Sequence, residues 1–201
     1  MAGETANPEQ ARFSFEELGK IIETYEDADL EHNGACFVNQ VYDEPGFSTL
    51  TGQELEDWKH EFPRIDDEEI ARLERELETA EMQLINTLGL ASAEILPGLC
   101  ESYHNECNRR QLEASLGPDI HDPWMSAITI DSLRLNPADM IAGGIAMSKL
   151  TGQAYIMHGG IRAGGTYNYM CVEASPESST DEIVAQFEAR GLDLASASEE
   201  S

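Results

Sequence analysis

The sequence predicts an α+β fold, in which a helical bundle over residues 13–116 precedes a small β-α-β-β-α unit over residues 124–191. The first observation is that apolar residues recur every three or four positions through the first half, as they do on one face of a helix. The second is that short alternating stretches and a glycine-rich segment follow residue 117, a pattern typical of strands and a turn. Residues 1–12 and 192–201 are mostly polar, so we expect a disordered N-terminus and a disordered acidic tail.

Two short amphipathic helices are expected first. Ser14 and Glu17 form a capping-box pattern, in which two side chains three positions apart satisfy the free amides at a helix start. The same pattern recurs at Thr51, and Pro63 ends the second helix. The stretch 36–42 between the two helices is apolar but too short to assign.

Two longer helices follow over residues 66–116. The first begins at Asp66 and carries apolar residues at nearly heptad spacing up to Gly89, a residue type that commonly ends helices. The second begins near Pro97, because proline is tolerated in a first turn, and ends before Gly117. Long helices with a short connection usually pack antiparallel, so we expect a helical hairpin whose sides the two short helices cover.

The second half predicts both strands and helices. In chain order, the expected elements are a strand around Ile128 and Ile130, a helix that begins at Asn136, strands over 155–158 and 166–173, and a helix over 180–191. The last two strands flank the glycine-rich segment 159–165, which predicts a β-hairpin with a flexible tip.

The charge of the chain is large and unevenly distributed. The 201 residues include 39 acidic and 12 basic side chains, a formal net charge of −27. Residues 1–113 hold 27 acids and 8 bases, residues 114–172 hold 4 and 3, and residues 173–201 hold 8 and 1. An excess of acids with few lysines resembles the composition of proteins from salt-loving organisms. Because such adaptation coats exposed surfaces with acids, the near-neutral segment 114–172 is expected to be buried or to contact another protein.

The same composition bears on partners and compartment. A strongly negative field repels phosphate, which argues against direct binding to nucleic acid or to an anionic membrane. The first ten residues have no basic and apolar run of the kind that directs export, and no stretch approaches the roughly 20 apolar residues that cross a bilayer. We therefore expect a protein of the cytoplasm or of a virion, with its four cysteines as free thiols.

Cysteine and histidine side chains offer weak candidates for a metal site. Zinc needs four convergent nitrogen or sulfur ligands, which in this sequence would be Cys36, Cys100, His104 and Cys107. Paired C-x-x-C motifs are absent, and two of these cysteines lie on an apolar helix face where core residues belong. The sequence therefore predicts no metal, and the glycine-rich segment lacks the order of a phosphate-binding loop, so no cofactor is expected.

The near-neutral half also contains the candidate interface residues Ile161, Arg162, Tyr167 and Tyr169, at and beside the predicted hairpin tip. The sequence predicts a non-enzymatic interaction or structural-assembly protein, adapted to high salt and of a kind that viral assemblies contain. It would dock onto itself, as a homo-oligomer, or onto another protein through its second half. The alternative is an acidic DNA mimic that inhibits a nucleic-acid-binding enzyme of a defence system, with its carboxylates on the predicted helix of Asp66, Asp67, Glu68, Glu69, Glu74, Glu76, Glu78 and Glu81.

Overall fold

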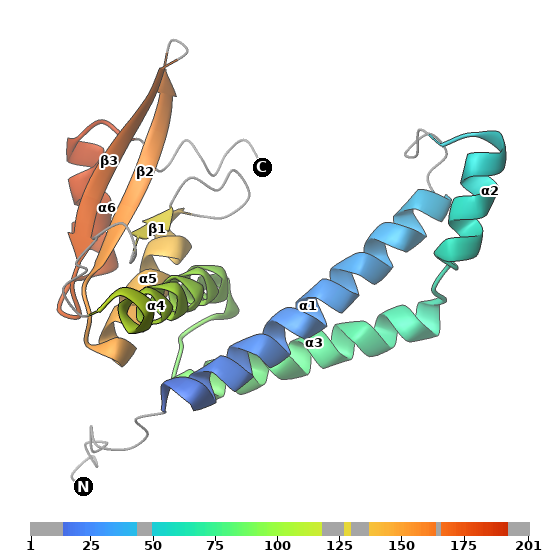
Figure 1. The fold of residues 1–201 in the computed structure, drawn as a ribbon, viewed down its shortest axis with the longest axis horizontal. Coiled ribbons are helices and arrows are strands. Elements are labelled where there is room, and N and C mark those ends of the chain that lie inside the picture. Colours follow the sequence, from blue (N-terminus) through green and yellow to red (C-terminus); the bar gives the residue numbers. More distant parts are fainter. Residues whose placement is uncertain (1–13, 44–49, 118–126, 130–136, 164–165, 193–201) are drawn as a thin grey trace, which may run out of the picture. The chain divides into compact units, whose positions relative to one another are not determined.

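The computed structural model describes residues 14–43, 50–117, 127–129, 137–163 and 166–192. It divides into a helical unit, residues 16–89, and a mixed unit, formed by residues 1–15 and 90–201. This division differs from the expected boundary at residue 116, because the helix over 96–116 packs against a helix of the mixed unit. The expected N-terminal helical region and the small β-α-β-β-α unit that follows it are confirmed (Figure 1).

The helical unit consists of three helices: α1 (Phe15–Asp43, of which Phe15 groups with the mixed unit), α2 (Gly52–Glu61) and α3 (Asp67–Leu88). Helices α1 and α3 run antiparallel (Figure 1). Their buried apolar residues are Leu18, Ile22 and Ala35 on α1 and Leu73, Ala80 and Leu84 on α3. Within the helical unit α3 thus packs against α1, whereas the helix over 96–116, which was expected to form a hairpin with it, belongs to the mixed unit.

Helix α1 is much longer than the short helix that the sequence predicts, because it continues through the unassigned stretch 36–42. Side chains near its end hold the other two helices in place. The Tyr42 hydroxyl lies 3.0 Å from the Lys59 carbonyl and 2.9 Å from the Phe62 carbonyl, and the amide of Ile65 donates to Asn39 Oδ1 over 3.1 Å. Tertiary contacts therefore support the second half of α1, where the local sequence pattern is weak.

Helix α3 begins and ends where the sequence predicts. The Asp66 side chain accepts a hydrogen bond from the amide of Glu69 over 2.9 Å, which caps the helix start. Gly89 has a φ of +63°, a left-handed conformation that glycine adopts without strain, and it ends the helix.

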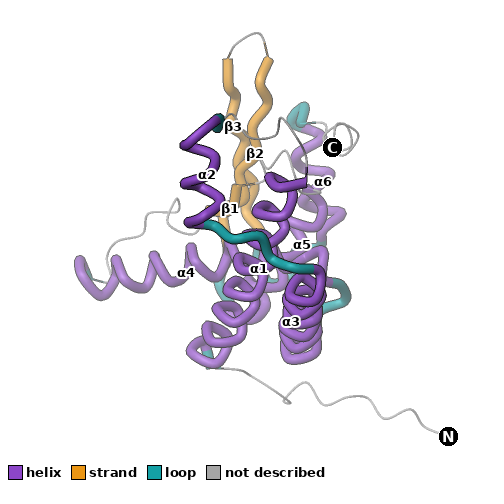
Figure 2. The backbone as a smooth tube through the Cα atoms, turned by 90° about the vertical axis from the view of Figure 1, so that its right-hand side faces the viewer, coloured by secondary structure: helices purple, strands orange, loops and turns teal. Residues whose placement is uncertain are grey.

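The mixed unit contains a short 3-10 helix, η1 (Ala93–Ile95), followed by α4 (Leu96–Leu116), β1 (Ala127–Thr129), α5 (Pro137–Thr151), β2 (Tyr155–Ala163), β3 (Thr166–Ala174) and α6 (Thr180–Ala189). In the sheet, β1 pairs parallel with β2, and β2 pairs antiparallel with β3. Helix α5 connects the two parallel strands and packs against α4 and α6 (Figure 2).

The core of the mixed unit lies between the sheet and helices α5 and α6. Alternate residues are buried in 155–159 of β2 and in 172–174 of β3, as expected for strands with one covered face. On α5, α6 and the described part of the sheet, the fully or almost fully buried apolar residues include Met140, Ile141, Ile145, Met147, Tyr155, Met157, Val172, Ala174, Ile183 and Phe187. Among the described residues, no helix is long and apolar enough to cross a membrane.

Candidate functional site

A two-stranded ribbon extends beyond the three-stranded part of the sheet. β1 pairs only with residues 156–158 of β2, whereas the pairing of β2 with β3 continues from Tyr155 to Ala163. We call residues 159–163 and 166–170 the distal ribbon. In the described part of the chain, the distal stretch of β2 has β3 as its sole strand partner, and Figures 1 and 2 show the ribbon projecting from the unit.

The four candidate interface residues all lie in the distal ribbon. Ile161 pairs with Asn168, Arg162 with Tyr167, and Gly160 with Tyr169. The segment 159–165 was expected to be a flexible tip, but its first five residues belong to β2, where they pair with residues 166–170 of β3. The structure therefore brings the four residues onto one piece of regular backbone.

The distal ribbon belongs to a segment without acidic residues. Between Asp139 and Glu173 the sequence has no aspartate or glutamate, and its charged residues there are Lys149 and Arg162. Burial of most of α5 accounts for the first part of this segment. By contrast, the helical unit has 21 acidic and 5 basic residues. The distal ribbon also has no acidic residue. Neither pairing with β1 nor burial within the core around α5 explains this absence.

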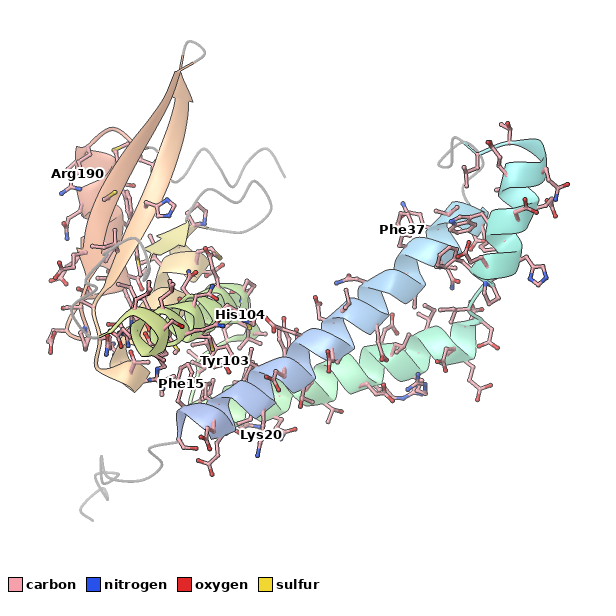
Figure 3. All side chains as sticks on the ribbon, viewed as in Figure 1. Phe15, Lys20, Phe37, Tyr103, His104 and Arg190 are labelled. Carbon is pink, nitrogen blue, oxygen red and sulfur yellow. The ribbon has the colours of Figure 1, made fainter. Side chains whose placement is uncertain are left out.

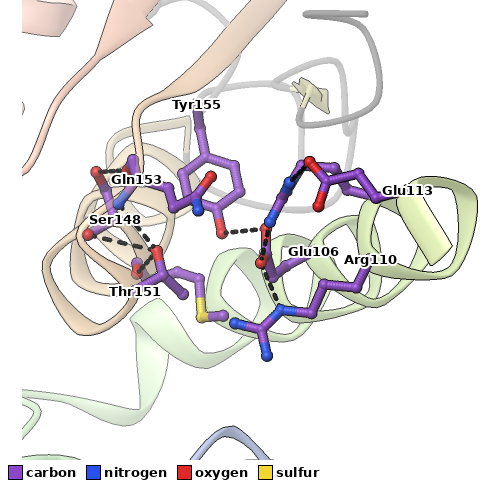
Figure 4. A network of polar contacts seen from close by, with 9 residues as sticks. Glu106, Arg110, Glu113, Ser148, Thr151, Gln153 and Tyr155 are labelled. Atoms are coloured by element: carbon purple, nitrogen blue, oxygen red, sulfur yellow. Dashed lines mark hydrogen bonds and ion pairs between the residues drawn. The ribbon is translucent and has the colours of Figure 1, made fainter. Parts of the chain in front are cut away.

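A buried polar network anchors the base of the ribbon (Figure 4). Glu106 on α4 is fully buried, and its carboxylate accepts two hydrogen bonds of 2.8 Å from Arg109 and one of 2.6 Å from Arg110. Arg109 also pairs with Glu113. The hydroxyl of Tyr155, the first residue of β2, lies 3.5 Å from Glu106 Oε2. The charged cluster of helix α4 therefore lies next to the first residue of β2, four residues before the distal ribbon begins.

The protonation states of this network suit a structural role. Burial alone would raise the pKa of the Glu106 carboxyl, but the hydrogen bonds from Arg109 and Arg110 outweigh it and lower the pKa below its usual value. Burial raises the pKa of the Tyr155 phenol to about 12. Near neutral pH the carboxyl is therefore ionised and the phenol protonated, so neither group is suited to give or take a proton there.

Two glycines bring α4 and α5 into backbone contact. A Cβ atom on Gly143 would lie 2.3 Å from the Ile95 carbonyl oxygen and 2.5 Å from the Leu99 amide nitrogen. A Cβ atom on Gly98 would lie 2.5 Å from the Met140 carbonyl oxygen. Both glycines are buried, so the close approach of the two helices depends on the absence of side chains at these positions.

The candidate metal ligands fall into two separate groups. Cys36 lies on α1 in the helical unit, with its Sγ 3.6 Å from His32 Nε2, whereas Cys100, His104 and Cys107 lie on α4 in the mixed unit. His104 is exposed and its ring contacts the edge of Tyr103, as the labels in Figure 3 help to locate. Among the described residues, no group of three or more histidine, cysteine, aspartate or glutamate side chains could hold a metal ion.

A surface hollow at the start of α3 has a balanced charge. It has a volume of about 550 Å³ and is lined by Pro63, Arg64, Ile65, Asp66, Glu68, Glu69, Arg72 and Arg75. Arg64 pairs with Asp43, and Arg72 pairs with Glu69. Because two of its three arginines already bind carboxylates of the same unit, the hollow does not point to an anionic ligand.

The acids considered for DNA mimicry differ in their surroundings. Asp66 caps α3, and Glu69 and Glu76 pair with Arg72, so these three are engaged within the unit. The pKa of Glu81 is raised, first by burial and then by the nearby carboxylates of Asp29 and Glu78. Some of the carboxylates considered for DNA mimicry are thus paired with arginine or lie close to other carboxylates. They do not form an evenly spaced set of exposed charges.

The comparisons give no relative from which a role could be carried over: the chain matches no protein-family model, no curated protein and no solved structure.

The network of Glu106, Arg109 and Tyr155 was not among the residues that the sequence indicates as functional. Its local signal is the Glu-x-x-Arg-Arg spacing over residues 106–110, which places both arginines one turn from the glutamate.

Proposed function

We propose that this chain is a non-enzymatic assembly protein that associates with further copies of itself through the distal ribbon, while its acidic helical unit faces a salt-rich solvent. One observation carries the proposal: the ribbon extends beyond β1, and no acidic residue occurs from Tyr155 to Val172 in a chain of net charge −27. Sheet extensions of this kind are frequent sites of contact between chains.

The charge distribution supports a contact at this place. Two copies of so acidic a chain repel one another, and repulsion is least where acids are missing. Salt reduces the remaining repulsion, because the screening length falls from about 10 Å at 0.1 M to about 3 Å at 1 M. Association through the distal ribbon is therefore expected to strengthen as the salt concentration rises.

The anchoring of the ribbon supports the same proposal. Tyr155 is fully buried with its hydroxyl 3.5 Å from Glu106 Oε2, and the close contact at Gly143 holds α5 against α4. A surface that is rigid before binding loses less conformational entropy on association. The start of β2, from which the distal ribbon extends, is therefore expected to be fixed before association.

Introducing negative charge into the ribbon tests the proposal. The double substitution Ile161→Asp and Arg162→Glu is expected to lower the oligomeric mass in sedimentation velocity, because it makes each copy more negative at the contact. The matched control, Lys149→Glu, adds charge on the exposed end of α5, outside the ribbon, and is expected to keep the oligomer. Circular dichroism is used to check that both variants fold. A double variant with the sedimentation coefficient of the unaltered protein would refute docking through the distal ribbon.

A further inference from the structure

The outer edge of β3 is open in the described part of the chain. The sheet order is β1-β2-β3, so β3 pairs on one side with β2 and has no strand on the other side among the described residues. An edge strand presents backbone amides and carbonyls that can pair with a further strand. With nine residues, Thr166–Ala174, β3 is long enough to act as such a template.

The register tells which backbone groups face the open edge. Ala163 pairs with Thr166, with two residues between them, and a two-residue hairpin closes on a hydrogen-bonded pair. Hydrogen-bonded and non-hydrogen-bonded pairs then alternate along the strands. The groups of Asn168, Met170 and Val172 therefore face β2, whereas those of Tyr167, Tyr169, Cys171 and Glu173 face outward.

A side-chain contact agrees with this assignment. Arg190, which is labelled in Figure 3, lies at the end of α6 and donates a hydrogen bond from Nη1 to the carbonyl oxygen of Cys171. The guanidinium thus occupies an outward carbonyl on the half of β3 nearest the core, and Glu173 adds a negative charge next to it. Charged groups at an edge are a common protection against unwanted strand pairing. The protected part of the edge ends at Cys171, and the backbone of Tyr167 and Tyr169 lies beyond it.

We infer that the contact between copies is an edge-to-edge pairing of β3 with β3 of a second copy, antiparallel, with Tyr167 opposite Tyr169 of the second copy. This inference rests on the proposed function and specifies its partner and geometry. The two-fold axis passes near Asn168, so that both copies use the same residues, as a two-fold interface requires. In this register residues 166–170 of one copy pair with residues 166–170 of the other. Cys171 and Glu173 extend past the end of the β3 strand of the second copy.

The charge of the paired segment fits a second copy. Residues 166–170 contain no charged side chain, and the nearest acid along the strand, Glu173, lies outside the paired span. A register shifted toward the core would place the Arg190 contact and two copies of Glu173 in the interface. Charge and the occupied carbonyl therefore both favour pairing at the distal end of the edge.

Amide hydrogen exchange measured by NMR tests the pairing directly. In dilute protein the outward amides of Tyr167 and Tyr169 are expected to exchange rapidly, and those of Asn168 and Met170 slowly. At concentrations where the protein associates, exchange at the two tyrosines is expected to slow by roughly tenfold or more, as the monomer fraction falls. Fast exchange of both tyrosine amides in the associated protein would overturn the inference.

A backbone variant gives an independent test. Tyr169→Pro removes an outward amide without removing a hydrogen bond to β2, and proline is tolerated at such edge positions. Tyr169→Ala is the matched control, since it truncates the side chain but keeps the amide. We expect the proline variant to associate at least about tenfold more weakly than the alanine variant, as one lost set of interfacial hydrogen bonds predicts.

The outcomes separate the two proposals. If the unaltered protein stays monomeric at every concentration, the proposed function fails and the edge pairing fails with it. If the unaltered protein associates and Tyr169→Pro associates as strongly as Tyr169→Ala, edge pairing is overturned while self-assembly stands. Should the proline variant not fold, as circular dichroism would show, the exchange rates of Tyr167 and Tyr169 in the unaltered protein decide.

Discussion

Replacing Gly143 by alanine is expected to destabilise the mixed unit by about 3 kcal/mol, the upper range for overpacking a well-packed site. The added Cβ would lie 2.3 Å from the Ile95 carbonyl oxygen and 2.5 Å from the Leu99 amide nitrogen. These are backbone atoms, which cannot move aside as the end of a flexible side chain can. The change therefore forces α4 and α5 apart, and urea unfolding followed by circular dichroism measures the loss.

A second glycine supplies the control. Gly34 lies within α1, is exposed, and a Cβ atom there would meet nothing within 4 Å. Gly34→Ala is therefore expected to stabilise the helical unit by about 0.5–1 kcal/mol through the better helix propensity of alanine. An unfolding midpoint of Gly143→Ala equal to that of the unaltered protein would show that the α4–α5 contact is not as close as described.

Replacing Glu106 by glutamine is expected to cost about 3 kcal/mol, the lower range for breaking a buried ion pair, because Arg110 is partly exposed and can bind water instead. Arg109, however, has a side chain that is 15% exposed, so the loss of the charge on Glu106 leaves it with Glu113 as its one remaining ionised partner among the described residues. Glu74→Gln, on the exposed surface of α3, is the matched control and is expected to change stability by less than about 0.5 kcal/mol.

The effect of Glu106→Gln should depend on pH with a defined sign. The pKa of Glu106 is lowered in the folded protein, so ionisation of this group favours folding above its ordinary pKa near 4.5. That contribution is lost as the pH falls through the lower, folded-state pKa. We therefore expect the stability difference between the unaltered protein and the glutamine variant to be full at pH 7 and to shrink below pH 4.5. A difference that is constant over this range would contradict the ionised cluster.

The boundaries of α3 could be predicted from the sequence because the signals there are local. Asp66 is a capping residue that bonds to an amide three positions on, and Gly89 adopts the left-handed conformation that ends a helix. The length of α1 could not be predicted in the same way. Its second half is supported by Tyr42 and Asn39, whose partners lie 17 to 26 residues further along the chain.

The support of the candidate site depends on contacts that are even more distant in sequence. Glu106 and Tyr155 are 49 residues apart, so neither reveals the other by spacing. Gly143 reads in the sequence as a residue that weakens its helix, whereas in the structure it permits the contact with α4. The β-hairpin that contains the distal ribbon could be predicted from the sequence, but the glycines at 159–160 concealed that β2 continues through them.

The molar mass of the protein, measured by light scattering at high protein concentration in 0.1 M and in 1 M KCl, tests self-assembly most directly. Self-assembly predicts a mass above the 22.2 kDa of one chain, with a larger associated fraction in 1 M KCl, where repulsion between acidic surfaces is screened. A mass of 22.2 kDa in both solutions would contradict self-assembly. It would favour the alternative, in which the acidic surface of the helical unit binds a basic, DNA-binding protein.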